Sequence, residues 1–161
     1  MSVNPRASQY RVEKWRSYAT VTLSNGDRLL GAFFVSAAGL HPPLPERVGD
    51  LLNSESGFFP FELHADTGSR TILVNRAQVI AVELAENEAR QDSGYDLAKR
   101  RMVAVRLANG QRIIGTVRVY RPEGSDRLSD WARQPSQFRY IELDQLTVIV
   151  NVAHVIDATE V

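Results

Sequence analysis

Apolar and polar residues alternate along two stretches of the chain, and each stretch runs into an Asn-Gly pair. Residues 20–23 read TVTL before Asn25-Gly26, and residues 103–107 read VAVRL before Asn109-Gly110. A period of two is typical of a half-buried strand, and Asn-Gly favours the positive φ angles of a type I′ turn. The pattern therefore predicts two tight β-hairpins.

The two hairpins belong to an internal repeat. The segment TVTLSNGDRLLG at 20–31 matches AVRLANGQRIIG at 104–115, and TILVNRAQVI at 71–80 matches TVIVNVAHVI at 147–156. The second copy is shorter between the matched segments, where loops are expected. Self-similarity of this kind indicates one structural unit written twice.

Each copy carries further apolar segments that predict about five strands. Gly31 and Gly115 stand inside the second strand, where glycine usually marks a bulge or a sharp bend. A polar segment with an apolar anchor follows, and it predicts a short helical turn. We expect an all-β protein of two tandem small β-barrels, SH3-like or Sm-like, with short capping helical turns.

The repeat also sets the expected organisation of the sequence. Residues 1–17 form a lead-in segment and 85–101 a polar linker or short helix, while 18–84 and 102–161 are the two barrel repeats. With 19 basic and 19 acidic residues, no overall field favours nucleic acid or an anionic membrane. Cysteine is absent and no apolar run approaches the roughly 18 residues of a membrane span. We expect a soluble, cytoplasmic protein.

Enzyme motifs are not recognisable, so we expect neither a catalytic site nor a cofactor. The histidines His41, His64 and His154 are isolated from one another, and a metal site is not expected. Glu62 and Glu142 recur in both copies between apolar residues, which predicts solvated strand positions.

The sequence resembles the Sm-like family in four features of each copy. These are the Asn-Gly turn, the glycine in strand two, the polar segment before strand three and the polar turn after strand four. In that family, ring-forming proteins bind RNA through an Asp and an Asn before strand three and an Arg-Gly pair in the last turn. The matching positions are Asp50, Asn53, Asn75 and Arg76. The second copy has Arg133 and Val152 at two of these positions, and neither copy has the glycine after the arginine.

A second resemblance is to uncharacterised bacterial domains that carry N-G-x-x-[LI]-x-G followed by R-x-x-D-x-L-N, and it implies no activity.

From the residues alone, Asn75 and Asn151 are expected to form the turn after strand four, and Asp50 and Asp130 are expected to cap the short helix.

Outward positions that differ between the copies are the remaining candidates. The first copy has Phe34 and Phe59, whereas the second has Arg106, Arg118, Arg139 and Tyr140. We expect a non-enzymatic protein-interaction or scaffold module whose protein partner is unidentified. The alternative is an RNA-binding protein of Sm-like type that uses the arginine face with Asn53 and Arg76. Whether a second copy of the protein also binds stays open.

Overall fold

The computed structural model describes residues 14–39, 44–120 and 127–161. Most of the expected lead-in segment, and His41, lie outside the described residues. The strands are β1 (Lys14–Leu23), β2 (Arg28–Ser36), β3 (Phe58–Ala65), β4 (Gly68–Asn75), β5 (Val79–Leu84), β6 (Lys99–Leu107), β7 (Arg112–Val119), β8 (Phe138–Glu142), β9 (Thr147–Asn151) and β10 (Val155–Glu160). They form one antiparallel sheet in the order β10-β6-β7-β8-β9-β5-β1-β2-β3-β4.

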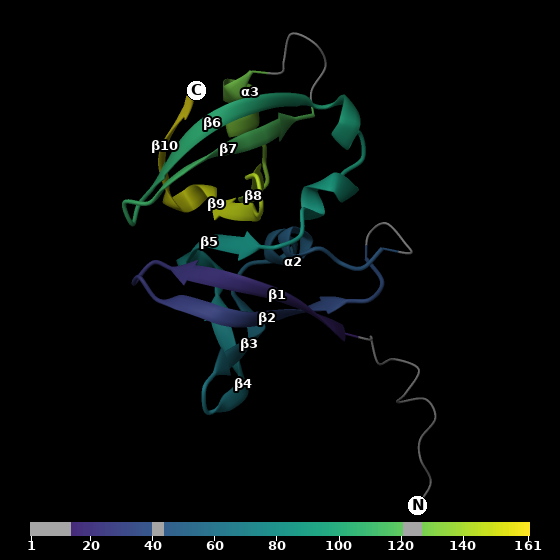
Figure 1. Cartoon of the computed structure of the whole chain (residues 1–161), viewed down its shortest axis with the longest axis vertical. Coiled ribbons are helices and arrows are strands. Elements are labelled where there is room, and N and C mark those ends of the chain that lie inside the picture. Colours follow the sequence, from purple (N-terminus) through teal and green to yellow (C-terminus); the bar gives the residue numbers. More distant parts are fainter. Residues whose placement is uncertain (1–13, 40–43, 121–126) are drawn as a thin grey trace, which may run out of the picture.

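The two halves of this sheet repeat one strand order. The first half runs β5-β1-β2-β3-β4 and the second β10-β6-β7-β8-β9, so β5 and β9 meet in the middle (Figure 1). The all-β class is confirmed. The sheet is not closed among the described residues, because β4 and β10 each pair with one strand, and the predicted arrangement of two tandem small β-barrels is therefore not confirmed.

Both Asn-Gly hairpins form, but the predicted type I′ turn is wrong. That turn needs a positive φ at both central residues, and among the described residues only glycines have one. Gly26 has φ 93° and Gly110 has φ 89°. The N–H of Leu23 donates to the C=O of Asp27 at 2.9 Å, which leaves a three-residue loop closed by a left-handed glycine.

The glycines inside β2 and β7 are explained by close approach of a neighbouring backbone. A Cβ on Gly31 would lie 1.8 Å from the C=O oxygen of Glu62, and one on Gly115 would lie 2.7 Å from that of Glu142. The β1–β2 register runs without a shift through Gly31, so the predicted bulge is absent at this pairing. Glycine lets the third strand of each half lie against the second.

Short helices follow the second strand of each half, as predicted. They are α2 (Val48–Ser54) and α3 (Leu128–Ala132). Asp50 accepts a hydrogen bond from the N–H of Arg47 at 3.3 Å, and Asp130 does the same from Arg127 at 2.9 Å. Both aspartates thus satisfy a free N–H at the helix start, which confirms their capping role.

Single 3-10 turns join the other elements: η1 (Arg76–Gln78), η2 (Glu88–Gln91), η3 (Tyr95–Leu97) and η4 (Val152–His154). The side chains of Asn75 and Asn151 accept from the N–H two residues on, in Ala77 and Ala153, at 3.0 Å each. Their predicted turn role is confirmed.

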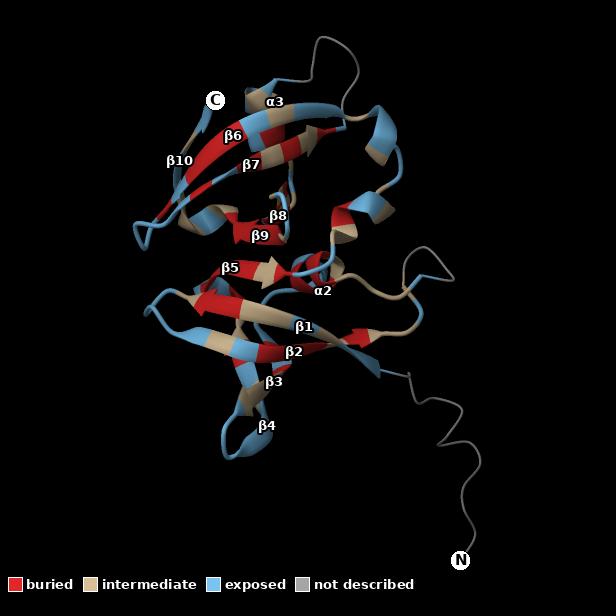
Figure 2. Cartoon of the chain, in the orientation of Figure 1, coloured by how far each residue is buried: buried red, intermediate tan, exposed pale blue. Residues whose placement is uncertain are grey.

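The hydrophobic core consists of two clusters that exchange residues where the halves meet. The cluster of the first half includes Phe138 and Ile149 from the second half, and the cluster of the second half includes Ile80 and Ala81 from the first. Figure 2 shows β5 and β9 largely buried and most of β4 exposed. Each half completes the core of the other.

Candidate interaction surfaces

The joint between the halves is a strand pair closed by two asparagine side chains. Ala81 on β5 lies opposite Val150 on β9, and Leu84 opposite Thr147. The side-chain amide of Asn151 donates to the C=O of Val79 at 2.9 Å. The joint is therefore held by backbone pairing and, at Asn151, by a buried polar contact across it.

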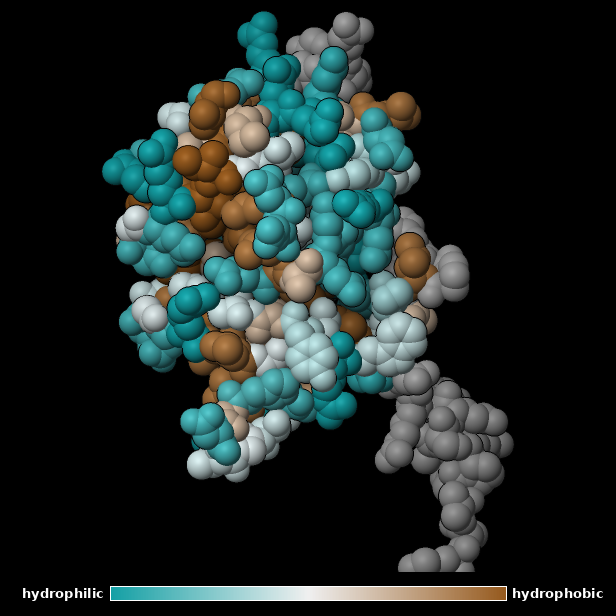
Figure 3. Space-filling view, in the orientation of Figure 1, coloured by the Kyte–Doolittle hydropathy of each residue, from teal (hydrophilic) through white to brown (hydrophobic). Residues whose placement is uncertain are grey.

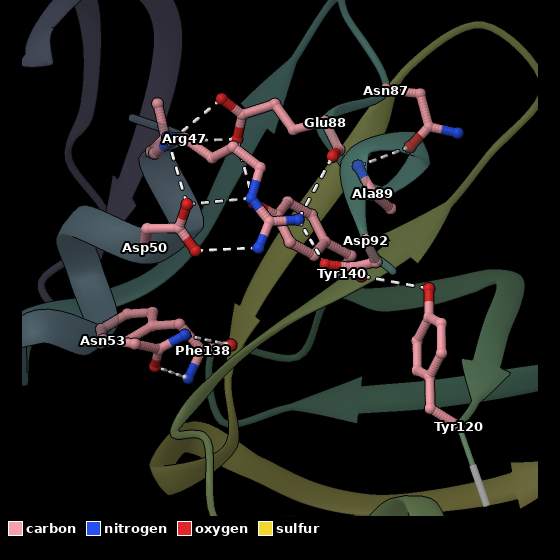
Figure 4. A network of polar contacts seen from close by, with 11 residues as sticks. Arg47, Asp50, Asn53, Asn87, Glu88, Ala89, Asp92, Tyr120, Phe138 and Tyr140 are labelled. Carbon is pink, nitrogen blue, oxygen red and sulfur yellow. Dashed lines mark hydrogen bonds and ion pairs between the residues drawn. The ribbon is translucent and has the colours of Figure 1, made fainter. Parts of the chain in front are cut away.

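Asn53 at the end of α2 ties the first half to the second. Its amide nitrogen donates to the C=O of Phe138, and its amide oxygen accepts from the N–H of the same residue, each at 2.9 Å (Figure 4). The Sm-like resemblance implied an RNA contact for this residue. In the structure both ends of its amide serve the joint.

A cleft of 390 Å³ lies beside the joint, lined by residues of α2, η2, β7, β8 and the segment after α3. Three arginines and three carboxylates line it, so its formal charge is balanced. The guanidinium of Arg47 contacts Asp50 at 2.8 Å and also contacts Asp92, whose other oxygen accepts from the O–H of Tyr120 at 3.0 Å (Figure 4). This network holds the linker against both halves.

Glu88 and Tyr140 form a half-buried polar pair of the network. The carboxylate of Glu88 accepts from the N–H of Val48 at 2.9 Å and from the O–H of Tyr140 at 3.1 Å. Burial raises the pKa of Glu88 above its usual 4.5, and these hydrogen bonds only partly offset that effect. Burial, together with the charge of Glu88, also raises the pKa of Tyr140, so its hydroxyl is a hydrogen-bond donor.

Arg118 and Glu142 form a further ion pair in the cleft, at 2.8 Å. The guanidinium of Arg118 also stacks on the ring of Tyr95, 3.5 Å from its centroid. Burial opposes ionisation of Glu142, but hydrogen bonds from Tyr95, Arg118 and Asn87 outweigh it and hold the pKa of Glu142 below its usual 4.5. The predictions that Glu142 is solvated and that Arg118 faces outward are both wrong.

Glu62, the equivalent of Glu142 in the first half, is not a freely solvated strand residue either. Its carboxylate contacts Arg16 and the ring of His64, each at 2.9 Å. The side-chain hydrogen bond with His64, followed by that from Arg16, holds the pKa of Glu62 below its usual 4.5. Both recurrent glutamates are thus ion-pair partners within the fold.

Three further predicted surface residues are buried. Phe59 packs in the core of the first half and stacks on Phe33, with ring centroids 5.2 Å apart. Arg76 donates to the C=O of Phe58 at 2.9 Å and to that of Leu51 at 3.1 Å. The guanidinium of Arg139 donates to backbone C=O groups of Trp131, Gln134 and Ser136. The expectation of an outward arginine row on the second half is therefore wrong.

The other predicted residues are partly accessible. Arg106 is exposed and forms an ion pair with Asp157 on the adjacent strand β10. Phe34 is half-buried beneath the guanidinium of Arg16, and Tyr140 is half-buried in the cleft. The structure does not bring the eight predicted residues together on one face.

The described residues hold no cluster of histidine and acidic side chains suited to a metal ion. Within the same part of the protein, no helix has both the length and the apolar character to cross a bilayer.

The open sheet edges were not identified from the sequence as candidate surfaces. Leu73 on β4, Phe58 at the start of β3 and Ile156 on β10 are exposed large apolar residues. Figure 3 shows hydrophobic surface gathered over β6, β7 and β10, with a smaller area over β2 and β3. Unpaired strand edges with exposed apolar side chains are sites where other polypeptides add strands.

Comparisons of the sequence with protein-family models, with curated proteins and with solved structures found no match.

Proposed function

We propose that this protein is a non-enzymatic interaction module, built from two fused small barrel-like units, that binds proteins by strand addition at its two open edges. One observation carries the proposal: within the part of the chain that the structure describes, β4 and β10 each pair with a single strand, and each bears an exposed large apolar side chain, Leu73 or Ile156. An added strand would pair with the free backbone groups and cover these side chains.

The cleft residues support this proposal because their charged groups are already paired within the fold. Arg47, Asp50, Asp92, Arg118 and Glu142 have partners within the network, so their charges hold the linker in place. Recognition of an external ligand would have to replace contacts that the fold uses. Among the described residues, no strand pairs with the free side of β4 or β10.

RNA binding of the Sm-like type is less well supported. Asn53 and Arg76 are engaged with backbone groups of Phe138, Phe58 and Leu51. Of the proposed basic face, only Arg106 is exposed, and it is paired with Asp157. A nucleic-acid site needs arginines that are available to phosphate groups.

The experiment is cross-linking of the full-length protein in extracts of the source cell, with the linked peptides identified by mass spectrometry. We expect links to concentrate on residues 68–75 and 155–160, and to be lost in Leu73→Asp and Ile156→Asp. Leu97→Asp is the matched control, because Leu97 is 90 % exposed on η3, outside both edge strands. Partners that survive both edge variants would overturn the proposal. RNA binding that falls steeply with salt would favour the alternative.

A further inference from the structure

We infer that the partner at each open edge is a second copy of this protein, with β4 of one copy pairing with β10 of the next as β9 pairs with β5 within a single copy. This inference rests on the proposed function, since it names the strand that is added. In the internal repeat, β4 is the equivalent of β9 and β10 is the equivalent of β5. The protein therefore carries both sides of its own joint a second time, and no other described strand pairs with them.

The exposed apolar residues on the edge strands, and on β3 beside one of them, are the equivalents of residues buried in the joint. Phe58, Leu73 and Ile156 are 60 %, 69 % and 58 % exposed. Their equivalents Phe138, Ile149 and Ile80 are 3 %, 0 % and 1 % exposed. The same side-chain types are thus covered where the strands have a neighbour and uncovered where they do not. A second copy supplies the matching surface.

The internal joint also fixes the expected register between copies. Since Ala81 lies opposite Val150 and Leu84 opposite Thr147, Asp157 should lie opposite Val74 and Glu160 opposite Thr71 of the neighbour. The side-chain amide of Asn75 would then donate to the C=O of Val155 in that neighbour, as Asn151 donates to Val79.

One pair of substitutions makes the joint between copies weaker than the internal one. Asp157 stands where Ala81 is buried, and Arg106, its ion-pair partner, stands where the first half has Thr22. Association would desolvate this ion pair, which is usually unfavourable compared with well-packed small residues. Charged residues on an edge strand also limit pairing with unrelated strands. We therefore expect reversible self-association.

The two edges lie at opposite ends of the molecule, with β4 at the bottom of the view and β10 at the upper left (Figure 1). They cannot pair with each other within one molecule of this shape. A contact between two different surfaces is heterologous, so assembly continues from copy to copy until a ring closes. The expected product is a head-to-tail oligomer.

The test is sedimentation of the purified full-length protein from about 1 µM to about 1 mM. The average mass of the wild type should rise above 18.0 kDa with concentration. Leu73→Asp and Ile156→Asp should each raise the dissociation constant at least about tenfold, whereas Leu97→Asp should leave it unchanged. Circular dichroism checks that each variant is folded.

Mixing the two edge variants tests the direction of assembly. Leu73→Asp keeps an intact β10 edge and Ile156→Asp an intact β4 edge, so an equimolar mixture should form a heterodimer and nothing larger. A symmetric contact between like edges would give no gain on mixing and would overturn the inference. The double variant R106T/D157A should associate more tightly, by at least about fivefold.

A wild-type protein that stays monomeric throughout this range would overturn self-assembly. The proposed function would survive that result if partners from cell extracts still cross-link to the two edges. Self-association that persists in both edge variants would overturn the inference as well, because another surface would then carry the contact.

Discussion

Arg76 and Arg139 place a guanidinium group against the same point of the capping helix in the two halves, although they stand at different positions of the repeat. Arg76 follows β4 and donates to the C=O of Leu51, while Arg139 lies in β8 and donates to that of Trp131. Leu51 and Trp131 are equivalent in the repeat. A buried guanidinium at this point is thus common to both halves.

At the position equivalent to each arginine, the other half has an apolar residue. The first half has Phe59 where the second has Arg139, and the second has Val152 where the first has Arg76. Each guanidinium lies near an aromatic ring, Arg76 at 5.5 Å from Phe59 and Arg139 at 5.1 Å from Trp131. The two differences are therefore parts of one exchange within the core.

This exchange predicts that the second half can take its buried guanidinium from position 152 in place of position 139 and keep its fold. Arg139→Phe alone should lower the free energy of unfolding by about 1–3 kcal/mol, because buried backbone C=O groups lose their donor. Adding Val152→Arg supplies the guanidinium from the position used in the first half, and R139F/V152R should be the more stable of the two variants. Urea denaturation measures the difference.

Val152→Arg in the wild-type background is the control. It should destabilise the protein, since a second guanidinium then competes for the same C=O groups. The double-mutant cycle should give a coupling free energy that favours the double variant. If the effects of the two single substitutions on the free energy of unfolding simply add, positions 139 and 152 do not supply a guanidinium to the same C=O groups.

The local features of the fold could be predicted because the sequence expresses them locally. Alternation, the Asn-Gly pairs and the repeat led to the strands, the hairpins and the helical turns. The turn type was wrong because a glycine alone can supply the positive φ angle that a three-residue loop needs. Asn25 therefore need not adopt it.

The surface was harder to predict, since exposure depends on contacts between distant segments. Phe59 and Arg139 were placed outside because they differ between the copies, although alternation puts them on the inward face of their strands, two residues before Phe61 and Ile141. The difference at each is matched by the change at Arg76 and Val152. No local feature of the sequence indicates that β5 pairs with β9. Only that pairing shows why Ile149 is buried while Leu73 is exposed.

Asn53 should matter for stability through the joint. Asn53→Ala removes two hydrogen bonds and leaves the N–H and C=O of Phe138 without these partners. The expected loss is about 1–3 kcal/mol in the free energy of unfolding. Asn53→Asp should also destabilise, because a carboxylate cannot donate to the C=O. An unfolding free energy unchanged in both variants, measured in urea, would mean that the contact does not hold the halves together.

Glu142 should contribute stability that depends on acid. Its folded pKa lies below 4.5, so its contribution is present above about pH 4.5 and is lost as pH falls through the folded pKa. Glu142→Gln should therefore destabilise by about 1–3 kcal/mol at pH 7. The gap to the wild type should narrow towards pH 3, as followed by urea denaturation at each pH.

Glu83→Gln is the matched control for this experiment. Glu83 pairs with Arg28 at 3.2 Å on the exposed surface, where an ion pair contributes little. Its stability should follow that of the wild type at every pH. If the unfolding free energy of Glu142→Gln changes with pH in parallel with that of the wild type, the titration of Glu142 does not cause the pH dependence.

Glu88 should act in the opposite sense, because its folded pKa is raised above 4.5 by burial. Between its unfolded and folded pKa values the native state binds more protons than the unfolded state, so the stability it contributes is complete below about pH 4.5 and is lost as pH rises through the folded pKa. Glu88→Gln removes this dependence. The difference in unfolding free energy should shift in favour of the variant as pH rises from 4.5 towards neutrality, although both proteins keep an acceptor for the N–H of Val48. Urea denaturation over this range provides the measurement. A difference that stays constant, or that shifts towards the wild type, would show that the carboxyl group of Glu88 does not titrate with a raised pKa.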